Sequence, residues 1–433
     1  MSPENVPTDA ADASPIAHSR RWRRWLLGIV VIGLLAAWPQ LSSWYALRQV
    51  RSALSERDAD RAQRWLEQAQ AWTGETAETS LLQARIYRRK GLLNDLQLAL
   101  TRALRAGAPR EKVQAEEWLA QAQSGQLRSS LPHLSDLLVQ QQVDINEVCE
   151  AYIGGYLLNH RYVEALRLAD NWVNDFPAAA YPRMVRAQAH KAARHEKQAS
   201  EEFAAAHQMD PSDPAIAIAL ADSLVETKQH QAAIPLYQQA RQRSDLASRA
   251  VLGLAVCWKV LGRPGDAIQI LAERLKEDPS NIDLQFELGR DYLDEGQPEE
   301  AVRLLRPALD KAPGNIELRY ALAQSLSAVG MKDEAARQFA KVEQGWKITA
   351  EVTRLQDEAM RAPQNIELRI QIGQKLSSIH QDELALIWLH SVLDLDPAHP
   401  EAHRLLAEYY ERKAADDPSY APLARQHRQA SGK

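Results

Sequence analysis

Prolines that recur at one fixed interval restrict the fold of this chain more than any other feature of its sequence. The interval is 34 positions, as from Pro177 to Pro211, and it is doubled once, from Pro211 to Pro279. The full series is Pro177, Pro211, Pro279, Pro313, Pro363 and Pro397. A period of this length is typical of stacked helical hairpins, in which each unit packs only against its neighbours. The sequence therefore predicts an elongated all-α array rather than one compact core.

Between the prolines, the same residue types return at the same offsets. A small residue is followed by Ala after twelve residues, by a small or apolar residue after seven more, and by Pro after a further five. Small residues are expected where two helices cross closely. The clearest lines of this pattern are Ala187, Ala199, Ala206, Pro211; Gly289, Ala301, Ala308, Pro313; and Gly373, Ala385, Val392, Pro397.

The pattern resembles the tetratricopeptide repeat family. Leu220, Leu254 and Leu288 stand just before the small residue of a first helix, and Phe203 and Tyr237 take the aromatic site of a second helix. The resemblance implies a right-handed superhelical α-solenoid of helical hairpins. It covers residues 146–349 and 366–399. Counting back in the same steps predicts degenerate hairpins over 46–145, with Ala62, Ala69, Ala84 and Ala103 near the expected sites.

The N-terminal segment differs sharply from the repeats. Residues 1–19 have no apolar periodicity and are expected to be a disordered tail. Residues 20–45 combine an Arg cluster with an uncharged run from Trp25 to Trp38, which predicts a single transmembrane anchor. The Arg cluster favours an array on the non-cytoplasmic, periplasmic side. The alternative is a cleaved signal peptide, since Leu35-Ala36-Ala37 loosely resembles a cleavage site.

One step of the period is too long. Pro313 and Pro363 are 50 residues apart, and the excess falls near residues 350–365, which are expected to be a helical insertion. Apolar residues continue there at a spacing of three or four. This spacing indicates either one second helix extended by about four turns or a restarted helix. The segment is a packing element or, alternatively, a helix that docks a partner or a second copy.

The rest of the composition argues against several functions. The formal net charge is −5 and no Lys/Arg block follows residue 24, so a nucleic-acid partner is not expected. Cys149 and Cys257, the only cysteines, are expected to be buried packing residues. His399 and His403 are spaced by four, but His399 precedes Pro400 at a helix start. They are expected to be exposed histidines rather than metal ligands.

No catalytic motif is present, and no small-molecule substrate, metal or cofactor is predicted. Residues 400–433 begin as another first helix and turn polar, which predicts a capping helix and tail. The resemblance implies protein or peptide partners on a concave surface lined by the first helices. The residues expected there are Asp222, Glu226, Asp283, Arg290, Asp294, Glu317, Tyr320, Gln324 and Gln374.

Two functions fit these features. The first is a membrane-anchored scaffold or adaptor that mediates protein–protein interactions, in assembly of the cell envelope. The alternative is a non-catalytic regulatory subunit of a complex for envelope polysaccharide synthesis or cytochrome maturation. In either case the concave surface is expected to bind an extended or helical segment that is polar to basic.

Overall fold

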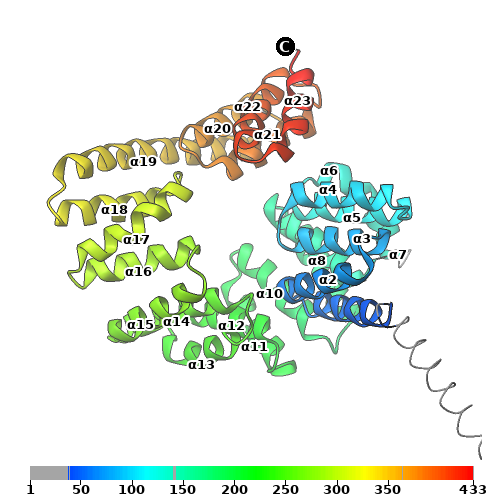
Figure 1. Ribbon diagram of the computed structural model, residues 1–433, viewed down its shortest axis with the longest axis horizontal. Coiled ribbons are helices and arrows are strands. Elements are labelled where there is room, and N and C mark those ends of the chain that lie inside the picture. The colour runs from blue at the N-terminus through cyan, green and yellow to red at the C-terminus, as the bar shows by residue number, and fades with distance from the viewer. Residues whose placement is uncertain (1–37, 39, 140–142, 363, 433) are drawn as a thin grey trace, which may run out of the picture. The chain divides into compact units, whose positions relative to one another are not determined.

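The computed structural model describes residues 38, 40–139, 143–362 and 364–432, and this part of the chain contains helices and no strands (Figure 1). The chain divides into two compact units, Met1–Val113 and Gln114–Lys433. The expectations for residues 1–19 and for most of the anchor at 20–45 lie outside the described residues. Among the described helices, none is both long enough and apolar enough to cross a bilayer.

The first unit is made of paired helices. Its core includes Ala62, Ala69, Ala84 and Ala103, and none of these residues has exposed surface. Asp58 and Thr76 cap the starts of two helices by accepting hydrogen bonds from backbone N–H groups. The helices are residues 40–55, α2 (Ala59–Thr73), α3 (Ala77–Arg89), α4 (Leu93–Arg105) and the beginning of α5 (Arg110–Gln123).

The second unit continues the alternation. After α5 comes an irregular second element, made of α6 (Leu127–Ser130), a 3₁₀ turn (Leu131–His133) and α7 (Leu134–Val139). The first helices that come next are α8 (Ile145–Leu158), α10 (Ala180–Ala192), α12 (Pro214–Glu226), α14 (Ala247–Val260), α16 (Ile282–Asp294), α18 (Ile316–Ala328), α20 (Ile366–Ser378) and α22 (Pro400–Asp416). The second helices are α9 (Tyr162–Asp175), α11 (Glu196–Met209), α13 (His230–Ala240), α15 (Pro264–Glu277), α17 (Pro298–Lys311), α19 (Lys332–Arg361), α21 (Asp382–Leu395) and α23 (Ala421–Ala430).

Small residues lie at the close crossings, as the sequence pattern predicted. Ala187, Ala221 and Ala323 have no exposed surface. At Gly289 an added Cβ would lie 2.7 Å from the Leu305 side chain, so a larger residue at the α16–α17 crossing would displace Leu305. The two cysteines are also buried as expected, with Cys149 2% and Cys257 0% exposed.

A left-handed residue follows each first helix from α8 to α20. Gly262, Gly296 and Gly330 have φ values of 75°, 72° and 86°. At the equivalent earlier turns the left-handed residue is basic, and these residues are His160, Arg194 and Lys228. A left-handed backbone disfavours a side chain, but the charges of Arg194 and Lys228 lie near the negative end of the helix dipole, which compensates part of this cost.

The long step of the period is a single helix. Helix α19 runs for 30 residues without a break, which is the first of the two forms expected for it. Its first part packs against α18, where an added Cβ at Gly345 would lie 2.9 Å from Ile316. Its later part packs against α20, and Val352, Leu355 and Ala359 belong to the buried cluster formed there. Figure 1 shows α19 running past the end of α18 to reach α20.

Helices α18 and α20 consequently meet end to end. Gly314, just before α18, lies against the turn after α20, where an added Cβ would be 2.3 Å from the His380 carbonyl oxygen. In the other adjoining pairs from α8 to α18, and in α20 and α22, the first helices pack side by side. The insertion thus displaces the last two hairpins along the axis of α19.

The C-terminal residues differ from one sequence expectation. His399 caps α22, since its Nδ1 accepts the Ala402 N–H at 3.3 Å. His403 was expected to be exposed, and this is wrong, because its side chain is only 9% exposed. Helix α23 folds back on α22 and covers it. Because α23 is rich in polar residues, no apolar periodicity marked it in the sequence.

Candidate functional site

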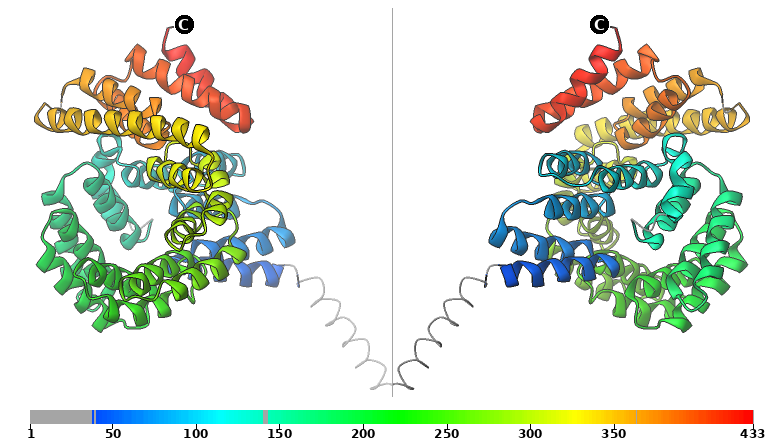
Figure 2. Two further views of the ribbon diagram at one scale, coloured as in Figure 1. Left: turned by 90° about the vertical axis from the view of Figure 1, so that its left-hand side faces the viewer. Right: turned by 90° about the vertical axis from the view of Figure 1, so that its right-hand side faces the viewer.

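The candidate site is the exposed side of the first helices from α10 to α18, here called the inner face. In this part of the chain, first helices of adjoining hairpins contact one another, whereas second helices of adjoining hairpins make no comparable contact. Helices on the inside of a curved stack are closer together than those on the outside. Figure 2 shows this succession of hairpins from green to yellow.

The predicted residues on α12 are engaged within the chain. Glu226 accepts a hydrogen bond from Lys191 of α10, with an Nζ–Oε1 distance of 2.5 Å. Asp222 accepts from the Tyr237 hydroxyl at 2.6 Å and from the Arg249 guanidinium of α14. Both acids therefore join successive first helices, and neither is left as a free charge for a partner.

A more deeply buried ion pair joins α14 to α16. Lys259 Nζ lies 2.8 Å from Asp291 Oδ1 and 3.1 Å from Glu287 Oε2. Asp291 is only 3% exposed, and burial raises the pKa of its carboxyl above the ordinary value, against the effect of Lys259. Burial alone would lower the pKa of Lys259, but the two carboxylates raise it. This triad was not predicted from the sequence, where Lys259 is 28 and 32 residues from its two partners.

The predicted residues on α16 and α18 are less engaged. Asp283, Arg290 and Asp294 are exposed and follow one another at helical spacing along α16. Arg290 lies over the Phe286 ring and donates to Glu287 at 3.3 Å. Asp283 and Asp294 make no hydrogen bond or ion pair through their side chains within the described residues.

On α18, Glu317 and Gln324 are exposed as well. Glu317 lies in the first turn, where an acid is favourable to the helix dipole. Tyr320 packs against Phe339 and Trp346 of α19, with ring centroids 5.9 Å and 5.5 Å away. Trp346 is 51% exposed and lies beyond the point where the second helix of a regular hairpin would end. An aromatic surface therefore adjoins the acids.

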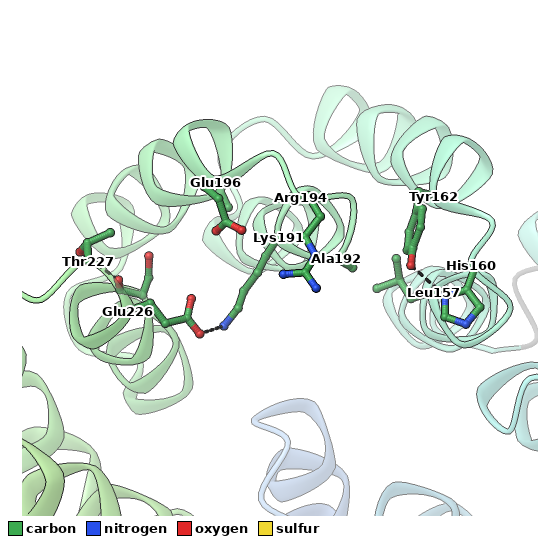
Figure 3. A pocket seen from close by; sticks show the side chains of 11 residues that line it. Leu157, His160, Tyr162, Lys191, Ala192, Arg194, Glu196, Glu226 and Thr227 are labelled. Carbon is green, nitrogen blue, oxygen red and sulfur yellow. Dashed lines mark hydrogen bonds and ion pairs between the residues drawn. The ribbon is translucent and has the colours of Figure 1, made fainter. Parts of the chain in front are cut away.

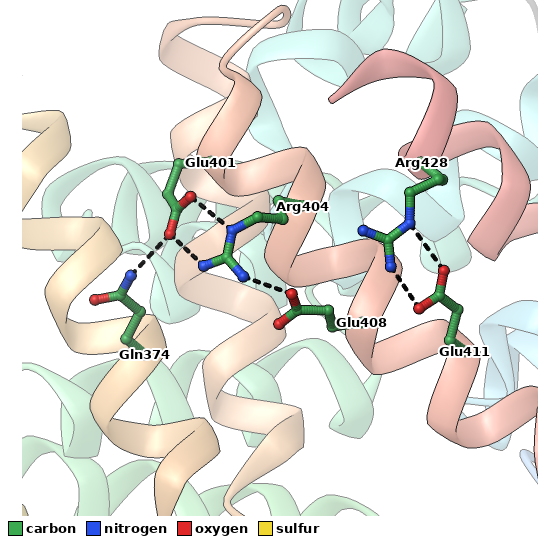
Figure 4. Close-up of polar contacts among 6 residues, drawn as sticks. All are labelled: Gln374, Glu401, Arg404, Glu408, Glu411 and Arg428. Carbon is green, nitrogen blue, oxygen red and sulfur yellow. Dashed lines mark hydrogen bonds and ion pairs between the residues drawn. The ribbon is translucent and has the colours of Figure 1, made fainter. Parts of the chain in front are cut away.

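The predicted residue on α20 is used within the fold. Gln374 donates to Glu401 Oε1 of α22 at 3.0 Å. Figure 4 shows that Arg404 then pairs with both Glu401 and Glu408. These polar contacts join α20 to α22. The side-chain amide of Gln374 is therefore engaged within the chain.

A pocket of about 660 Å³ lies at the ends of α8, α10 and α12. Figure 3 shows Arg194 between the His160–Tyr162 contact on one side and the Lys191–Glu226 pair on the other. Arg194 is exposed and its side chain has no partner within the described part of the chain. The pocket was not predicted from the sequence. Left-handed turns were expected at glycines, whereas His160 and Arg194 occupy such turns here.

Two groups of residues bear on the chemistry of the described part of the chain: possible metal ligands and the cysteines. They contain no group of three or more His, Cys, Asp or Glu side chains that could hold a metal ion. Burial raises the pKa of Cys149 to about 12 and raises that of Cys257. A buried thiol with a raised pKa is a poor nucleophile at neutral pH.

These helical pairs, their small crossing residues and their inner face define a helical repeat protein. Residues 224–287 and 292–344 match the family model for the tetratricopeptide repeat, over about a quarter of the chain. These residues are therefore tetratricopeptide repeats, as the sequence pattern predicted. Proteins of this class generally mediate protein–protein interactions. No curated protein matches the chain.

Solved structures also resemble this chain at low sequence identity. The Cut9–Hcn1 complex of the APC/C is 16% identical, with a TM-score of 0.46, over 82% of this chain and 68% of that one. YrrB, described as a TPR protein with an unusual peptide-binding site, is 24% identical, with a TM-score of 0.29, over 46% and 95%. Human IFIT1, solved with PPP-AAAA, is 14% identical, with a TM-score of 0.42, over 74% and 91%.

Proposed function

We propose that the chain is a membrane-anchored scaffold in cell-envelope assembly, which holds a polar-to-basic protein segment on the inner face of α16 and α18. The observation that carries this proposal is the state of Asp294. This acid lies at the C-terminal end of α16, where the helix dipole disfavours negative charge. It is exposed and makes no compensating pair within the described residues.

Glu226 provides the internal contrast. It also lies at the C-terminal end of a first helix, but Lys191 compensates it. A cation from a partner would do the same for Asp294. Asp283 and Glu317 extend the exposed negative charge along α16 and α18, and Trp346 offers an aromatic face for an Arg or Lys side chain.

The membrane tether rests on residues 20–45 of the sequence. The described end of this segment adds a compatible feature, since Trp38, Trp44 and Tyr45 are each more than half exposed. Such rings are favoured at the level of lipid headgroups. The array then lies on the non-cytoplasmic side, as the Arg cluster before the apolar run indicates.

Affinity purification from solubilised membranes tests the partner surface. The variant carries Asp283→Lys, Asp294→Lys and Glu317→Lys, and the matched control reverses two exposed acids on second helices, Glu273→Lys and Asp310→Lys. We expect the first variant to lose its co-purifying partners at least tenfold and the control to retain them. Equal recovery with both variants would exclude this surface.

Protease treatment of spheroplasts tests the tether and its orientation. We expect the repeats to be digested from outside while the chain remains in the membrane fraction after alkaline extraction. Protection of the repeats would contradict the non-cytoplasmic assignment. Release of an intact chain into the periplasmic fraction would instead identify the segment as a cleaved signal peptide.

A further inference from the structure

Three histidines gather where the last three helices meet. His390 belongs to α21, His403 to α22 and His427 to α23. The ring centroids of His403 and His427 are 5.1 Å apart, and those of His390 and His427 are 6.3 Å apart. His403 and His427 are 9% and 7% exposed. None of these residues belongs to the inner face, so the histidine cluster is independent of the proposed partner surface.

Hydrogen bonding links two of these rings to each other and to the backbone. His403 Nε2 lies 3.0 Å from the Pro397 carbonyl oxygen, which can only accept, so Nε2 carries a hydrogen. Nδ1 of His403 lies 2.8 Å from Nδ1 of His427. A hydrogen bond between these two nitrogens needs a hydrogen on one of them and a lone pair on the other, so the closed arrangement excludes a hydrogen on both.

No negative charge compensates a proton added here. On α22, the Tyr410 ring stacks on His427 with centroids 5.5 Å apart, and Tyr420 of the 3₁₀ turn Pro418–Tyr420 stacks on Tyr410. The acid that follows His390 on α21, Asp394, interacts with Arg128 and Arg369. Within the described residues no carboxylate forms a hydrogen bond or ion pair with any of the three imidazoles.

Beside the cluster, one ion pair joins the same two helices. Arg428 of α23 donates through Nε and Nη2 to the two carboxylate oxygens of Glu411 on α22, at 2.9 Å and 2.5 Å. This pair is exposed, so salt screens it. It nevertheless opposes any separation that the histidines cause.

We propose that α23 is a pH-sensitive cap, which the hydrogen-bonded histidine cluster holds on α22 and which protonation of that cluster releases. One added proton can leave the hydrogen bond between the two rings in place. If both rings were fully protonated, two N–H groups would face each other at 2.8 Å and the contact would be lost. Release exposes the apolar face of α22 at the end of the stack, which includes Leu406 and Tyr410.

The direction of the pH effect follows from burial. Burial, reinforced by the neighbouring histidines, lowers the pKa of His427 to about 4, and it lowers the pKa of His390 to about 4 as well. A released His427 regains an ordinary pKa near 6.5. The open form therefore binds more protons between these values, and each such histidine favours opening by up to about tenfold per pH unit as the pH falls from about 6.5 to about 4.

Hydrogen exchange of the detergent-solubilised full-length chain tests the cap. Exchange of the α23 amides is measured at pH 7.5 and pH 5.0 and corrected for the intrinsic rates. We expect at least a tenfold loss of protection in α23 at pH 5.0, and little change in α16, which contains no histidine. Equal protection of α23 at the two pH values would overturn the proposal.

His427→Phe removes the titrating group while keeping a ring to stack on Tyr410. We expect α23 of this variant to stay protected at pH 5.0. The matched control is His195→Phe, from the exposed His190–His195 pair, whose Nδ1 atoms are 3.3 Å apart. In the His195→Phe variant, α23 should lose protection at pH 5.0 as it does in the wild type. Loss of protection in His427→Phe equal to that of the wild type would reject the role of His427.

A second readout does not depend on the folding of any variant. The C2 proton of His427 in the intact chain is followed by NMR between pH 4 and pH 8, together with the amides of α23. Titration of this ring coupled to release of α23 supports the cap. Titration near pH 6.5 with α23 still in place would overturn it, since the closed cluster could then hold the charge.

Discussion

Two junctions between first helices differ in how they are built. Between α14 and α16, the helices pack side by side and the buried Lys259–Asp291 pair crosses the interface. Between α18 and α20, the helices meet end to end at Gly314, and α19 supplies the packing that a side-by-side neighbour would give. The first junction depends on a charge pair and the second on backbone proximity.

The difference between the junctions explains how the repeat tolerates a long insertion. In a regular stack each hairpin buries its face on the next one. At the second junction the insertion carries its own apolar surface, with Val352 and Leu355 buried in a cluster with residues of α20. The hairpins after the insertion are therefore stabilised although they do not lie beside α18.

The largest expected effect is at the first junction. Lys259→Met leaves the buried carboxylate of Asp291 without its cation, which typically costs about 3–5 kcal/mol. Since burial already raises the pKa of Asp291, protonation relieves the variant, and its loss should be larger at pH 8 than at pH 5. Urea unfolding of the full-length chain at the two pH values measures both effects.

Lys191→Met is the matched control for this prediction. Lys191 and Glu226 are 39% and 49% exposed, so the loss of their pair should cost at most about 1 kcal/mol. If both variants lost the same free energy of unfolding, the distinction between a buried and an exposed bridge along the inner face would be wrong.

A smaller effect is expected at the second junction. Gly314→Ala places a Cβ 2.3 Å from the His380 carbonyl oxygen, so the backbone must move, at a cost of about 1–3 kcal/mol. Hydrogen exchange should show increased opening of α20 and α21 ahead of α14 and α16. Gly265→Ala, in open space at the start of α15, should be neutral or slightly stabilising. An equal loss in the two variants would rule out the end-to-end contact.

The smallest effect is expected at the left-handed turns after the first helices, which occur on both sides of the insertion. Gly262→Ala strains a left-handed residue and should cost about 1 kcal/mol. Gly262→Arg should cost less, by about 0.3–1 kcal/mol, because the cation faces the C-terminus of α14. The difference between the two midpoints in urea would test the explanation of the basic residues at Arg194 and Lys228.

The repeat itself was predictable, because crossing residues such as Ala221 and Gly289 must be small whatever surrounds them. Whether an inner-face residue is engaged within the chain or left exposed was not predictable. Asp222 and Asp294 look alike in the sequence, and only the position of Arg249 on the next helix separates a bridging acid from an exposed one. Glu226, Gln374 and His403 depend in the same way on residues that are 35, 27 and 24 positions away.

The extra length of α19 also has an angular consequence. The left-handed residues Gly330 and His380 stand 50 positions apart, whereas Gly296 and Gly330 stand 34 apart, a difference of 16. At about 100° per residue, this excess adds four full turns and about 160°. Nearly half a revolution brings α20 round to the side of α19 that α18 occupies, which explains why the two helices are collinear. An insertion of about 18 residues, roughly five whole turns, would instead send the last hairpins on in their original direction.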